Sequence, residues 1–243
     1  MLCALTEAAA ESGLDADIIG PPAIEELDEN RDWLAESYHA LPPFSVGPFF
    51  IYGSHYAGPL PDGEIPLMIE AATAFGSGEH GTTSRCLLAI DHVKKSGFTP
   101  KNILDMGCGS GILAIGAAKL WPDIPIEAAD NDPECVRVTL RHIEANKAAT
   151  ITAYQSEGYE AQSPVWNNAP FDFIIANILA APLIDMAQSQ AKALADGGYL
   201  ILSGMLQEQA ARVEAAYAAQ GLVLEAGFPG DEWMTLLLVK KKA

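Results

Sequence analysis

The 243-residue sequence is poor in basic side chains: 14 Lys and Arg stand against 32 Asp and Glu, for a formal net charge of −18. A field of this sign repels phosphate backbones, so broad electrostatic binding of nucleic acid is not expected. A basic protein or a cationic small molecule would be attracted instead. The same acidity also keeps a protein in solution, and composition does not separate these two explanations.

Paired cysteines and long apolar runs are also missing. The four cysteines, at positions 3, 86, 108 and 135, form no Cys-x-x-Cys pair, which argues against a zinc site and a disulfide scaffold. No apolar run approaches the ~20 residues of a membrane span. The N-terminal segment lacks the basic residues of a signal peptide. We therefore expect a cytoplasmic protein with reduced thiols, no metal site and no membrane partner.

Apolar residues make up 49% of the sequence, enough for a sizeable core. Residues 1–40 are Ala-rich and acidic and predict one or two helices. The Pro- and Gly-rich stretch 41–66 predicts short strands and turns, as in a linker or a hairpin. From about residue 65 onward, short apolar strands alternate with amphipathic helices. This alternation predicts an α/β fold with a doubly wound, mostly parallel sheet.

Seven segments have the length and composition of strands in this part of the chain. They are Asn102–Met106, Pro125–Asp130, Thr150–Tyr154, Phe171–Asn177, Tyr199–Ser203, Leu222–Ala226 and Met234–Val239. The expected helices are Gly111–Leu120, Pro133–Lys147, Leu183–Leu194 and Leu206–Gln220. Only a short turn separates the last two strands, whereas parallel neighbours need a long crossover, so we expect these two to form an antiparallel hairpin.

The strongest signal for a ligand is the strand, glycine-rich turn and helix start at residues 103–111. Gly107, Gly109 and Gly111 would let a ligand approach the backbone, and the turn N–H groups could donate to it. A dinucleotide-binding turn, Gly-x-Gly-x-x-Gly, would place its third glycine at Ile112, where it is missing. Asp105, just before the turn, suits a cationic ligand better than a pyrophosphate. The amino group of S-adenosylmethionine is such a cation.

Polar residues end two later strands. Asp130 could accept hydrogen bonds from both hydroxyls of a ribose. It could instead cap the next helix, although Asp132, directly before Pro133, suits that role better. Asn177 lies at the strand end where open α/β sheets bind ligands, so its amide could orient an incoming amine. The alternative is an asparagine that forms the turn before the next helix.

A second glycine-rich loop, residues 75–83, opens another helix upstream. The hydroxyl of Thr83 would be available there to a ligand carboxylate or as a helix cap. His80 is the imidazole within this loop, and packing at the helix start is its expected role.

The segments FGSGEHGTT, ILDMGCGSGILAIGAAKL, AADNDP, ANILAAPL and GGYLILSG together resemble the ribosomal protein L11 methyltransferase family, PrmA, over roughly residues 44–241. The resemblance implies a class I S-adenosylmethionine-dependent methyltransferase with a seven-stranded Rossmann-like sheet that ends in an antiparallel hairpin. It implies N-methylation of lysine side chains and of the N-terminal amine of that ribosomal protein. It assigns cofactor contacts to Thr83, Gly107, Asp130 and Asn177, with Asn177 also catalytic, and it extends the cofactor site to Phe75, Gly76, Gly78, Asp105, Gly109 and Gly111.

The sequence departs from the family pattern in two places. Ser77 stands where the family usually has threonine, and only about 40 residues precede the linker, fewer than the family's substrate-gripping N-terminal domain. We therefore expect residues 1–62 to be a remnant of that domain plus a linker, and residues 63–243 to be the methyltransferase domain. A methyltransferase of the same fold with another protein or a small molecule as substrate remains an alternative, as does an NAD-linked dehydrogenase or a binding protein.

Overall fold

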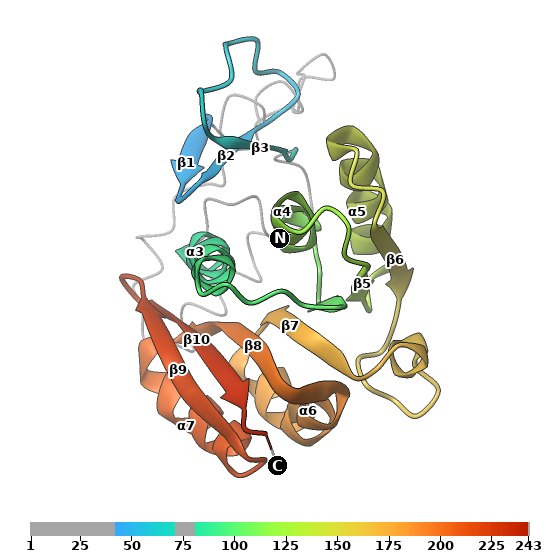
Figure 1. The fold of residues 1–243 in the computed structure, drawn as a ribbon, viewed down its shortest axis with the longest axis vertical. Helices are drawn as coiled ribbons and strands as arrows, with labels where there is room; N and C mark the ends of the chain where they lie inside the picture. The colour runs from blue at the N-terminus through green and yellow to red at the C-terminus, as the bar shows by residue number, and fades with distance from the viewer. Residues whose placement is uncertain (1–41, 71–80, 243) are drawn as a thin grey trace, which may run out of the picture. The chain divides into compact units, whose positions relative to one another are not determined.

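The computed structural model describes residues 42–70 and 81–242, which belong to one compact unit (Figure 1). The main sheet has seven strands in the order β6-β5-β4-β7-β8-β10-β9. Their bounds are β4 Ile103–Met106, β5 Ile126–Asp130, β6 Ile151–Gln155, β7 Phe171–Asn177, β8 Leu194–Leu206, β9 Leu222–Pro229 and β10 Trp233–Lys240. Strands β4 to β8 pair in parallel, while β10 is antiparallel to both β8 and β9. The predicted doubly wound sheet and its antiparallel C-terminal hairpin are confirmed.

Helices cover both faces of this sheet. On one face lie α3 (Gly81–Lys95), α4 (Ile112–Leu120) and α5 (Pro133–Asn146), and on the other lie α6 (Ala180–Ala193) and α7 (Gln207–Ala218) (Figure 1). A short 3-10 helix, η2 (Pro164–Asn167), precedes β7. Helix α6 begins at Ala180 rather than at the predicted Leu183, because a proline such as Pro182 is tolerated in the first turn of a helix.

The central strands are buried on both faces, which explains their continuous apolar runs. In β7, Phe173 and Ile175 pack into the core beneath α3 and α4, and Ile174 and Ala176 pack into the core beneath α6 and α7. This alternation is the two-residue period of an extended strand. The sheet is therefore held from both sides, and the ends of its strands have fixed positions.

A second, three-stranded sheet precedes the main one. It consists of β1 (Phe44–Val46), β2 (Phe49–Tyr52) and β3 (Ile65–Met68), with β1 antiparallel and β3 parallel to β2. The short strands predicted for residues 41–66 are confirmed, and of the two expected forms, linker or hairpin, β1 and β2 form a hairpin. Phe49 and Leu67 are fully buried in the same core as residues of α3 and α4, so this small sheet packs against the main one.

The strand order places three strand ends side by side. From β4 the chain moves outward through β5 to β6, then returns to place β7 on the other side of β4. Such a switch point is where open α/β sheets bind ligands, at the carboxyl ends of the strands. Within the described ranges, no helix is long and apolar enough to cross a membrane. The same ranges contain no group of three or more His, Cys, Asp or Glu residues that could hold a metal ion.

Candidate functional site at the switch point

The glycine-rich turn after β4 has a backbone that only glycine adopts easily. Gly107 has φ +74° and Gly111 has φ +79°, both in the left-handed region. A Cβ on Gly107 would lie 2.4 Å from Cγ2 of Ile178, and one on Gly111 would lie 2.8 Å from Cγ2 of Thr139. The turn is thus packed between the end of β7 and helix α5, so its glycines are required by conformation and by space.

The turn's own N–H groups are largely used within the protein. Gly107 and Cys108 both donate to the carbonyl oxygen of Ala129, at 2.7 and 3.1 Å, and Gly111 donates to that of Cys108 at 2.7 Å. Gly109 donates to the carboxylate of Asp130. We expected these groups to donate to a ligand, but these four already have acceptors, so what the turn offers is close backbone approach.

Asp105 lies at the base of the turn and is fully buried. Its Oδ2 accepts from the backbone N–H of Ala114, at 3.0 Å, while Oδ1 has no hydrogen-bond partner among the described residues. Burial raises the pKa of this carboxyl to about 7; the Ala114 N–H lowers it, and the nearby charge of Asp130 raises it further. A buried acid with one unpartnered oxygen is suited to a cationic donor.

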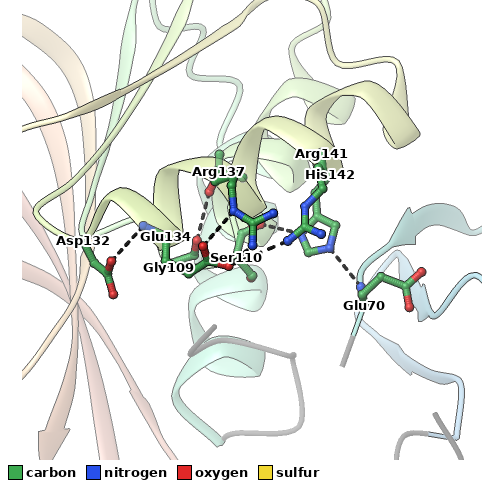
Figure 2. Close-up of polar contacts among 9 residues, drawn as sticks. Glu70, Gly109, Ser110, Asp132, Glu134, Arg137, Arg141 and His142 are labelled. Carbon is green, nitrogen blue, oxygen red and sulfur yellow. Dashed lines mark hydrogen bonds and ion pairs between the residues drawn. The ribbon is translucent and has the colours of Figure 1, made fainter. Parts of the chain in front are cut away.

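Asp130 and Asp132 have separate tasks at the end of β5. Asp130 is 8% exposed, and its carboxylate accepts from the N–H groups of Gly109 and Asp132, at 2.9 and 3.0 Å. A carboxylate has about four acceptor positions, so two remain for a ligand. Asp132 caps α5 by accepting from the N–H of Glu134 at 2.8 Å (Figure 2), which confirms the predicted cap.

Asn177 ends strand β7, and Thr83 lies near the start of helix α3. Asn177 is the last residue of β7, half-buried and paired in register with Ser203 of β8. The next residue, Ile178, donates its N–H to the Ser203 carbonyl at 3.0 Å, and Leu179 is 69% exposed. Thr83 lies inside the first turn of α3, fully buried, and its hydroxyl has no hydrogen-bond partner among the described residues.

The strand pairing brings several of the predicted residues together. Asp130 ends β5 and Asn177 ends β7, the two neighbours of β4, and Asp105 lies one residue before the end of β4. The glycine turn follows β4 directly. The predicted site residues Phe75, Gly76 and Gly78 lie outside the described residues, as does His80.

Sequence reasoning missed the contribution of α5. Thr139 donates its hydroxyl to the carbonyl oxygen of Gly109 at 3.0 Å, and Nδ1 of His142 lies 2.7 Å from that of Ser110. Both side chains are buried, so water does not compete for these bonds. The spacing of Thr139 and His142 indicates that they share one face of the helix, because residues three positions apart do so. The same spacing is equally typical of two polar residues on a solvent-exposed face, so it does not predict contacts with the turn.

A doubly wound sheet with its C-terminal hairpin, a glycine turn and acids at the switch point defines an S-adenosylmethionine-dependent methyltransferase of the Rossmann-like class. The chain belongs to the ribosomal protein L11 methyltransferase family, whose model matches residues 8–241. The resemblance seen in the sequence segments is thereby confirmed.

The relatives of the same name are longer than this chain, which spans about three quarters of their length. The chain is 44% identical to ribosomal protein L11 methyltransferase of Chelativorans sp. (strain BNC1), over 87% of this chain and 72% of that protein. It is 40% identical to the protein of the same name from Caulobacter sp. (strain K31), over 94% of this chain and 78% of that one. Among solved structures, ribosomal protein L11 methylase from Lactobacillus delbrueckii subsp. bulgaricus superposes with a TM-score of 0.71 at 25% identity, covering 82% of this chain and 99% of that one.

Proposed function

We propose that this protein transfers methyl groups from S-adenosylmethionine to nitrogen atoms of ribosomal protein L11, namely lysine side chains and the N-terminal amine. The observation that carries the proposal is the meeting of Asp105, Asp130 and Asn177 around one glycine turn, in a chain of this family. A cytoplasmic location agrees with that substrate. The fold alone would also serve a methyltransferase for another protein or a small molecule.

The described residues fit the cofactor, group by group. The unpartnered oxygen of Asp105 would accept from the cofactor's ammonium group, and the unpartnered hydroxyl of Thr83 would donate to its carboxylate. The two remaining acceptor positions of Asp130 match the two ribose hydroxyls. The glycine turn allows the cofactor to pass close to the backbone. Phe75, Gly76 and Gly78 are proposed to complete the site.

The reaction needs positioning more than acid–base power. The bound cofactor supplies a methyl group on a positively charged sulfur. The amine of the substrate attacks the methyl carbon from the side opposite the sulfur, and the sulfur is the leaving group. The amine nitrogen uses its lone pair to form the new N–C bond, the sulfur keeps the electron pair of the broken bond, and the surplus proton passes to water. Asn177 would orient the neutral amine without holding a charge beside it. Because a free lysine has a pKa near ~10.4, desolvation at the site would favour the neutral form it must adopt.

The charge of the chain is suited to such a substrate. A net charge of −18 attracts a lysine-rich segment and speeds its encounter at low ionic strength. We propose that residues 63–243 form the methyltransferase domain and that residues 1–62 are a remnant of a substrate-recognition domain plus a linker. Phe49 and Ile51, from the N-terminal side of this boundary, pack in the core with α3 and α4.

Labelled methyl transfer to purified L11 tests the proposal. We expect label in L11 with the parent protein, and mass spectrometry of peptides should locate it on lysine and N-terminal nitrogens. Asn177→Ala should transfer much less label at saturating cofactor, because its amide is proposed to contact the cofactor and to orient the amine. Cofactor binding without transfer to L11, together with transfer to another component of a cell extract, would favour the alternative substrates.

A further inference from the structure

Helix α5 connects the glycine turn to the end of strand β3 through one imidazole ring. Figure 2 shows His142 between Ser110 and Glu70. Its Nδ1 lies 2.7 Å from the carbonyl oxygen of Ser110, and the backbone N–H of Glu70 donates to its Nε2 at 3.1 Å. The side chain is only 4% exposed. Glu70 and His142 are far apart in sequence, so this bridge exists only in the folded chain.

The two partners fix the protonation state of the ring. A backbone N–H can only donate and a carbonyl oxygen can only accept, so Nε2 carries the lone pair and Nδ1 carries the hydrogen. Protonation at Nε2 would place two N–H groups against each other. Burial holds the pKa of His142 below its ordinary value; the Ser110 carbonyl and the Glu70 carboxylate oppose this, and Arg141 adds to it. The neutral ring is the form that fits.

Neighbouring residues of α5 extend the same connection. Thr139 binds the carbonyl of Gly109, so two consecutive carbonyls of the turn are held by this helix. One turn later, Asn146 exchanges two hydrogen bonds with the backbone of Met68, at 2.9 and 2.8 Å. Lys119 of α4 donates to the Asn146 carbonyl at 2.8 Å and is the nearest charge from that helix. Of Thr139, His142 and Asn146, His142 is the residue that contacts both the glycine turn, at Ser110, and the segment directly after β3, at Glu70.

We propose that His142 is a positioning residue for methyl transfer, which as a neutral imidazole holds the glycine turn at a fixed separation from the backbone of Glu70. This inference rests on the proposed function, because the turn matters only if the cofactor binds there. His142 acts through the Ser110 carbonyl and contacts no reacting atom. When the bridge is absent, the turn must be ordered as the cofactor binds, and that ordering weakens the affinity.

Two substitutions and one matched control test the role. His142→Ala removes both hydrogen bonds and should weaken binding of S-adenosylhomocysteine, measured by calorimetry at pH 8, by about tenfold or more. His142→Gln keeps one donor and one acceptor in an amide, so its affinity should stay within about threefold of the parent. Leu140→Ala, on the same helix but half-exposed, should bind like the parent.

The pH profile separates positioning from a purely structural role. As the pH falls from 8 through the lowered pKa of His142, the parent should lose affinity more steeply than His142→Gln, because only the parent ring can be protonated. Long-range 1H–15N NMR of the parent, without any ligand, should show hydrogen on Nδ1 and a lone pair on Nε2. That spectrum needs neither cofactor nor activity.

The outcomes distinguish the two proposals. Parent-like affinity in folded His142→Ala, equal pH profiles for the parent and His142→Gln, or hydrogen on Nε2 in the NMR spectrum would each overturn the positioning role and leave the methyltransferase proposal intact. Failure of the parent protein to bind S-adenosylmethionine or S-adenosylhomocysteine would overturn the proposed function and the positioning role with it.

Discussion

Replacement of Asp130 by alanine should cut cofactor affinity while leaving a folded protein. In the proposed complex, Asp130→Ala leaves two ribose hydroxyls without their acceptor in a site where the side chain is only 8% exposed. The loss of such bonds costs about 1–3 kcal/mol, which corresponds to about a ten- to hundredfold increase in Kd. The assay is calorimetric titration with S-adenosylhomocysteine at a temperature well below unfolding.

The same substitution has a predictable cost in stability. Asp130 accepts from the N–H groups of Gly109 and Asp132, and alanine leaves both donors unpartnered. Each unpartnered buried group costs about 1–3 kcal/mol, less where water reaches it, so Tm should fall by several degrees at about 2–4 °C per kcal/mol. The Kd must therefore be measured on protein that circular dichroism shows to be folded.

Asp132→Ala is the matched control for this experiment. It removes the same charge two positions away but breaks only the cap bond to the N–H of Glu134. We expect it to lose about 1 kcal/mol of stability and to keep parent affinity. Unchanged Kd in folded Asp130→Ala, or an equal loss of affinity in Asp132→Ala, would refute the assignment of Asp130 to the ribose.

Further predictions concern the turn, the buried acid, the catalytic amide and the N-terminus. Gly107→Ala should destabilise the protein more than Gly63→Ala, because both have positive φ but only the first meets a neighbouring atom, Cγ2 of Ile178; equal falls in Tm would contradict this. The raised pKa of Asp105 means that the folded state binds the proton of this carboxyl more tightly than the unfolded chain does. Its contribution to the free energy of unfolding is therefore lost as the pH rises from about 4 to about 7. Denaturant melts should show this fall in the free energy of unfolding in the parent and not in Asp105→Asn. Asn177→Ala should lower kcat by about tenfold or more with little change in Tm, whereas retained turnover with lost stability would mean that Asn177 serves only the turn. Removal of residues 1–41 should keep the Kd for the cofactor within about threefold and lower the rate on L11, and equal rates would argue against a recognition role for that segment.

Local sequence patterns were sufficient to predict the strands and helices of the main sheet. Buried parallel strands are short apolar runs bounded by glycine, proline or polar residues, as at Phe171–Asn177, which the structure reproduces. Strand β8 begins at Leu194, earlier than the predicted Tyr199. The prediction began too late because the sequence Asp196, Gly197 and Gly198 resembles a turn. Pairing with β7, through a register irregularity between Phe171 and Phe173, extends the strand across them.

The site was predictable where the functional residue ends a strand, and it was not where contacts are made from the side. Asp105, Asp130 and Asn177 follow from the rule that ligands bind at the carboxyl ends of strands. His142 does not follow from such a rule, since its partners Ser110 and Glu70 are 32 and 72 residues away. The internal use of the turn N–H groups was equally hidden, because it depends on Ala129 of the neighbouring strand.

The proposed roles divide the residues by the kinetic constant that each should affect. Asp105, Thr83 and Asp130 address the ammonium, carboxylate and ribose groups, none of which changes when the methyl group leaves the sulfur. Their interactions are therefore the same in the ground state and the transition state, and such uniform binding lowers KM without raising kcat. Asn177 faces the amine, whose nitrogen gains charge as the new bond forms, so its interaction does change along the reaction. Substitutions of Asp105, Thr83 or Asp130 should consequently raise KM for the cofactor at nearly constant kcat. Substitution of Asn177 should instead lower kcat. A fall in kcat at saturating cofactor in Asp130→Ala would show that the ribose contact also orients the methyl group.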